Sequence, residues 1–106
     1  MLRREESEAI PSDHCKLVID EELTIYVIDS IREELSKELD IYNNFDLNLA
    51  AVEEFDSAGV QLLLAFTHEI KRLEKTFTLS KASPVVMKLF DTYGLSDYFN
   101  IANAAW

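Results

Sequence analysis

Two short segments of strict apolar–polar alternation constrain the fold of this chain more than any other feature. Residues 45–49 read Phe-Asp-Leu-Asn-Leu, and residues 76–80 read Thr-Phe-Thr-Leu-Ser. Alternation with a period of two predicts β-strands that are buried on one face. Strands covered on both faces would be apolar throughout. We therefore expect a sheet with helices packed mainly on one face and a largely wet opposite face.

Segments with helical periodicity alternate with the strands. Residues 28–39 carry Ile, Ile, Leu and Leu at spacings of three, four and four, which predicts an amphipathic helix. Residues 57–75 predict a second helix whose first turns are deeply buried. Residues 16–20 are short and β-branched and predict an edge strand. The order strand, helix, strand, helix, strand, helix predicts an α/β fold with largely parallel pairing.

The third helix carries recognisable start and stop signals. Ser83 is expected to be its N-cap, and Pro84 its first helical residue, where a missing N–H costs nothing. Gly94 suits the left-handed residue that ends such a helix.

Length and composition bound the organisation and the location of the protein. The 106 residues have room for one domain, which we place at residues 14–106 behind a flexible tail at residues 1–13. The single cysteine excludes an intrachain disulfide. The polar start is no signal peptide, and no apolar run could span a bilayer. A cytoplasmic protein without membrane insertion is expected.

The formal net charge of −10 bounds the class of partner. Acidic side chains outnumber basic ones 20 to 10. Such a surface repels nucleic-acid phosphates and anionic lipid headgroups. It suits a protein partner that presents Arg and Lys.

The segment at residues 52–65 is the most informative part of the chain. A loop after the strand at residues 45–49 delivers Asp56-Ser57 to the start of a buried helix. The free N–H groups and the dipole of a helix N-terminus stabilise an anion, whether the Asp56 carboxylate or a phosphate on Ser57. Gly59 permits close approach of the neighbouring loop or of a partner's backbone.

The pattern Asp56-Ser57-Ala58-Gly59, followed by an apolar run, resembles the signature of STAS domains, the family named for sulphate transporters and anti-sigma factor antagonists. The segment at residues 83–95, with its Ser-Pro start and Gly-Leu end, is similar to the third helix of that family. The resemblance covers roughly residues 16–100. It implies a mostly parallel sheet of four to five strands.

The resemblance also implies a function. It points to the stand-alone antagonist type, in which the serine matching Ser57 is phosphorylated by an anti-sigma factor, a serine kinase of histidine-kinase-like fold. The unphosphorylated form binds that partner. The expected partner-binding residues are Asp56, Ser57, Ala58 and Gly59 together with Glu22 and Thr24 of the neighbouring loop.

The chain departs from the family pattern at two glycine positions. The family often reads Gly-Glu-Leu-Asp after the first strand, where this chain has Glu21-Glu22-Leu23-Thr24. The Gly-rich turn before the last strand is replaced by Glu74-Lys75.

Simpler interpretations compete with these. Ser57 could be only the N-cap of its helix. Glu22 and the acidic pair at residues 53–54 could be only a solvated face. Nothing supplies a base–nucleophile pair, a metal-ligand spacing or a glycine-rich phosphate loop, so we expect no enzyme, no metal and no cofactor.

Two rival functions remain open for a monomer or weak dimer of this type. One is an accessory STAS subunit bound to the ATPase of a lipid-transport ABC complex. The other is a helper protein of a chemotaxis or other signalling cluster.

Overall fold

Strand β4 lies inside a four-stranded sheet and carries the alternation that the sequence predicts. The computed structural model describes residues 2–6 and 10–99. Neighbouring strands follow the order β1-β2-β4-β6, with β1 antiparallel to β2 and the other pairs parallel. Their bounds are Leu2–Glu5, His14–Ile19, Asn44–Leu49 and Thr76–Ala82. Along β4, buried Phe45, Leu47 and Leu49 alternate with half-buried polar residues.

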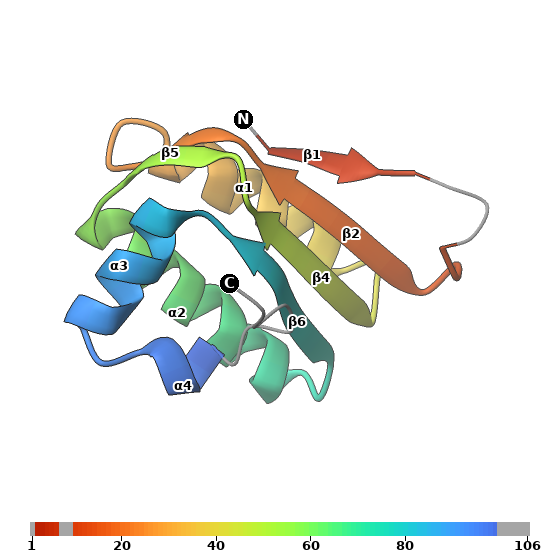
Figure 1. Cartoon of the computed structure of the whole chain (residues 1–106). Helices are drawn as coiled ribbons and strands as arrows, with labels where there is room; N and C mark the ends of the chain where they lie inside the picture. The colour runs from red at the N-terminus through yellow and green to blue at the C-terminus, as the bar shows by residue number, and fades with distance from the viewer. Residues whose placement is uncertain (1, 7–9, 100–106) are drawn as a thin grey trace.

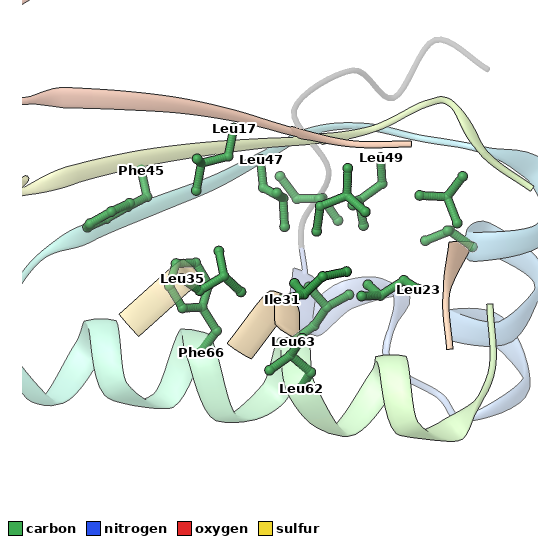
Figure 2. Close-up of a cluster of buried hydrophobic side chains, with 14 of the residues drawn as sticks. Leu17, Leu23, Ile31, Leu35, Phe45, Leu47, Leu49, Leu62, Leu63 and Phe66 are labelled. Atoms are coloured by element: carbon green, nitrogen blue, oxygen red, sulfur yellow. The ribbon is translucent and has the colours of Figure 1, made fainter. Parts of the chain in front are cut away.

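The helices cover one face of this sheet (Figure 1). They are α1 (Ile28–Leu39), α2 (Ser57–Arg72), α3 (Pro84–Thr92) and the short α4 (Ser96–Phe99). Figure 2 shows Leu47 and Leu49 pointing from the sheet towards Ile31 of α1 and Leu63 of α2, and all four side chains are buried. Thr76 and Thr78 are exposed between the inward-facing residues of β6. The predicted one-sided, mostly parallel α/β fold is confirmed.

A second, two-stranded sheet was not predicted. Strands β3 (Glu21–Leu23) and β5 (Val52–Phe55) pair in parallel. Segments of three and four residues that are rich in glutamate carry no readable alternation, and residues 52–55 resemble a loop. Their pairing brings the segments that follow β3 and β5 to the same end of the molecule.

The prediction of a flexible tail over residues 1–13 is wrong for Leu2–Glu5, because these residues form β1. Only Leu2 is apolar there, so the strand has no hydrophobic pattern. Arg4 is instead held by side chains of the α1 end: its Nη1 donates to the Tyr42 hydroxyl at 2.7 Å and approaches Glu38 Oε2 at 3.5 Å. With β1 in place, β2 is an inner strand and not the predicted edge strand. The far end of the predicted domain, residues 100–106, lies outside the described residues.

Cys15 is buried next to Glu38, and its thiol has low reactivity. Burial raises the pKa of its thiol to about 12, and the nearby Glu38 carboxylate adds to the effect. The thiolate, which is the reactive form, is therefore scarce at neutral pH.

Two helices end in the same way, one with glycine and one with glutamate. After α3, Gly94 has a φ of 68°, its N–H donates to Asp91 O, and Leu95 N–H donates to Phe90 O. This is a Schellman motif, and it confirms the predicted role of Gly94. The expected N-cap of α3 is confirmed as well, because Ser83 accepts from Val86 N–H and Pro84 follows.

At the end of α2 the left-handed residue is Glu74, with a φ of 58°. Its N–H donates to Lys71 O, and Lys75 N–H donates to Ile70 O. The helix therefore ends at Arg72, three residues before the predicted end. Glu21 is also left-handed, with a φ of 65°. The backbone thus keeps a glycine-like conformation at both places where the sequence departs from the glycine pattern.

Replacing Glu74 by glycine should raise the free energy of unfolding by about 0.5–1 kcal/mol, because glycine adopts the left-handed region without a Cβ penalty. Urea unfolding monitored by circular dichroism measures the change. The matched control is Glu34→Gly on the exposed face of α1, where the same substitution should lower stability by about 0.5–1 kcal/mol. A destabilised Glu74→Gly variant would contradict the assignment of strain to this turn.

Candidate functional site

The candidate site forms where β3 and β5 end. These strands run in parallel, so the loop at residues 24–27 and the start of α2 lie at one end of the molecule, on the left in Figure 1. Long-range pairing thus brings Thr24 and Asp56 together, although they are 32 positions apart in the sequence.

Asp56 is the residue that joins the two segments. Its Oδ1 accepts from Gly59 N–H at 3.1 Å, which makes it the N-cap of α2, and its Oδ2 accepts from Ile25 N–H at 3.0 Å. One carboxylate therefore caps the helix and anchors the neighbouring loop. The alternative interpretation of Ser57 as the N-cap is wrong: both residues are good caps, and Asp56 occupies the position.

Ser57 is the first residue of α2 and is exposed. Its hydroxyl makes no hydrogen bond to any described residue, so it is not needed to satisfy the helix end. It lies at the positive end of the helix dipole, where a phosphate would be stabilised. Ala58, beside it, is half-buried.

Gly59 is buried by the chain itself. A Cβ at this position would collide with the carbonyl oxygen of Leu23 and stand 2.7 Å from the ring of Phe55. The close approach that a glycine permits is therefore to the neighbouring strands. Gly59 seats α2 against β3 and β5, and it offers a partner no surface.

Thr24 and Glu22 are tied to each other. The Thr24 hydroxyl donates to Glu22 Oε1 at 2.5 Å, and Thr24 is only 6% exposed. Thr24 therefore shapes the loop from within, while Glu22 is half-buried. The six predicted site residues lie together, but only Ser57 among them is freely exposed.

Acidic side chains surround this end of the molecule. Glu22 lies opposite Glu54 in the β3–β5 register, and Glu21, Glu53 and Glu54 are exposed. Like charges that face each other across a strand pair destabilise it. Basic groups brought by a partner would relieve this repulsion.

The sequence analysis missed two residues of this site, Ile25 and Tyr26. They are 61% and 90% exposed. A signal was present: both are large and apolar, and both precede the stripe of α1 that begins at Ile28. Both side chains lie outside the core in the structure.

No three His, Cys, Asp or Glu side chains within residues 2–6 and 10–99 are arranged to hold a metal ion. No helix in these ranges has the length and apolar composition that crossing a bilayer requires.

Replacing Asp56 by alanine should lower the free energy of unfolding by about 1–2 kcal/mol, because the helix cap is lost. Ser57→Ala should change it by less than about 0.5 kcal/mol, because the Ser57 hydroxyl has no partner in the fold. Urea unfolding of both variants measures the difference. Equal losses in the two variants would contradict the assignment of the cap to Asp56.

Comparisons with known proteins agree with this geometry. The family model of the STAS domain matches residues 6–105. No curated protein sequence matches the chain.

Three solved structures share the fold. An anti-sigma factor antagonist from Mycobacterium paratuberculosis has a TM-score of 0.81 and 16% identity over 99% of this chain and 86% of that chain. The anti-sigma factor antagonist SpoIIAA in its unphosphorylated form has a TM-score of 0.76 and 22% identity over 92% and 84% of the two chains. The phosphorylated form of SpoIIAA, a cell fate determinant of Bacillus, has a TM-score of 0.71 and 21% identity over 92% and 87%. The family match over nearly the whole length, on a fold with Asp56-Ser57-Ala58-Gly59 at the strand-to-helix junction, shows that the chain belongs to the STAS domain family.

Proposed function

We propose that this chain is a non-enzymatic regulatory module of the anti-sigma-factor-antagonist kind. It binds a kinase-type anti-sigma factor in the cytoplasm, and phosphorylation of Ser57 switches that binding off. The observation that carries the proposal is the position of Ser57, which is exposed, free of fold-stabilising hydrogen bonds and placed at a helix N-terminus. The antagonist structures that share the fold, one of them phosphorylated, support it.

The fold can accept a phosphate at Ser57 without rearranging. Asp56 already caps the helix, so modification of Ser57 breaks no bond of the fold. The dipole of the 16-residue α2 offsets part of the added charge.

A bound partner could not accept the phosphate as easily. The group adds about −1.5 to −2 charges and three acceptor oxygens. In a packed interface beside Asp56 and the exposed Glu53 and Glu54, it would be repelled and costly to desolvate. Binding is therefore lost while the free protein stays folded.

The test is capture of partners from lysate of the source organism by wild type, Ser57→Ala and Ser57→Asp, with identification by mass spectrometry. We expect wild type and Ser57→Ala to capture a kinase-fold protein, and Ser57→Asp to bind it about 100-fold or more weakly, because like charges meet in the interface. Phosphorylation of purified wild type by the captured kinase should give the same loss. The matched control is Ser12→Asp, which adds the same charge at an exposed site before β2, at the opposite end of that strand from the candidate site.

Two outcomes would contradict the proposal. Binding of Ser57→Asp as tight as that of wild type would exclude a switch at Ser57. Capture of an ABC-transporter ATPase by wild type and Ser57→Asp alike would favour an accessory subunit, with a constant contact in place of a switch.

A further inference from the structure

Ile25 and Tyr26 form an exposed apolar pair beside Ser57. Tyr26 is 90% exposed and is the most exposed large apolar side chain among the described residues; Ile25 is 61% exposed. Apolar side chains left in water forgo the favourable free energy that their burial would release. A partner that covered them would recover part of this.

The loop that carries the pair is fixed before any partner arrives. Ile25 N–H donates to Asp56 Oδ2 at 3.0 Å, and Val27 N–H donates to Thr24 O at 3.0 Å. Buried Ile28 then begins α1. Because the backbone is held on both sides of the pair, little conformational entropy is lost when the pair docks.

A groove continues from this loop between α1 and α2. A hollow of about 290 Å³ is lined by Ile25, Ile28, Arg32, Ala58, Gln61, Leu62 and Ala65. A second hollow of about 140 Å³ shares Arg32, Leu62 and Ala65 with the first, so the groove extends along both helices. Ala58 connects it to Ser57, its neighbour in the sequence.

We propose that Ile25 and Tyr26 are the apolar anchor of the Ser57-dependent interface, and that the same partner covers the groove beside them. The anchor inserts into an apolar pocket of the partner whose rim is basic. The rim of the partner's pocket is basic because this end of the chain is acidic. Glu22 and Glu54 are paired in the strand register, and Glu21 and Glu53 are exposed. The inference rests on the proposed function and adds the residues that supply affinity when Ser57 is unmodified.

The anchor and the acidic rim should differ in their response to salt. Exposed charges at a rim act mainly on the association rate and are screened as ionic strength rises. Burial of Ile25 and Tyr26 is an apolar contact that salt does not screen. A loss that persists at high salt therefore identifies the anchor.

The test uses the purified kinase-fold anti-sigma factors encoded by the source organism, each titrated against wild type, Ile25→Ser and Tyr26→Ser. The matched controls are Ile41→Ser and Tyr93→Ser. Ile41 is 64% exposed and lies beyond the other end of α1, and Tyr93 is 51% exposed and follows α3. Urea midpoints equal to that of wild type establish that all variants fold.

We expect Ile25→Ser and Tyr26→Ser to raise the Kd for the partner by about 10- to 30-fold, at about 50 mM and about 500 mM salt alike. The controls should stay within about twofold. Glu54→Gln should instead weaken binding at low salt only.

Each other outcome overturns the inference in a different way. If a kinase-fold protein binds wild type and both loop variants equally, the anchor is wrong and the proposed function stands. If none binds wild type, the proposed function fails and the anchor with it. If sedimentation shows a wild-type dimer that Tyr26→Ser disperses, the pair contacts a second copy of this chain and not the kinase.

Discussion

The carboxylate of Asp56 directly joins the two segments that the β3–β5 pairing brings to the same end of the molecule. One oxygen holds the first turn of α2, and the other holds the backbone of the loop after β3. Loss of such a helix cap costs about 1–2 kcal/mol, which is large beside the marginal stability of a small domain. Ser57 and the Ile25–Tyr26 pair keep a fixed relation because this side chain and the β3–β5 pairing hold their two segments together.

Packing elsewhere in the fold holds the two segments that Asp56 joins in position. Leu62, Leu63 and Phe66 bury α2 against the sheet, so its N-terminus cannot shift freely. Gly59 lets the helix start lie directly against Leu23 and Phe55. The described helices pack on one face of the sheet, and the β3–β5 pairing places the site at one end of the molecule (Figure 1).

The sequence predicts well those elements that carry a hydrophobic period or a capping residue within their own segment. β4, β6 and the three longer helices each carry a period or a cap that can be read locally. β1, β3 and β5 could not be predicted, because a strand of three or four residues is defined by its neighbour. Arg4 shows why: it faces the helices as an apolar residue would, but it is held by Tyr42 and Glu38.

The candidate site, like the fold, could be predicted only where the information is local in the sequence. The resemblance pointed to the segment around Asp56 and Ser57, and the structure shows which hydrogen bonds form within it. Asp56 and Ser57 are both good caps, and only the bonds to Gly59 and Ile25 distinguish them. Ile25 and Tyr26 went unnoticed, although their position ahead of the α1 stripe was a readable signal.

The division of labour between Asp56 and Ser57 has a consequence for how this surface can diverge. Selection for folding acts on Asp56 whatever the chain binds, whereas the fold places no comparable demand on the Ser57 hydroxyl. If Ser57 is the proposed switch, relatives that no longer use it can lose the serine and retain the aspartate beside it. A relative with another residue at position 57 but the same aspartate before it would be a domain that retained the fold and lost this regulation.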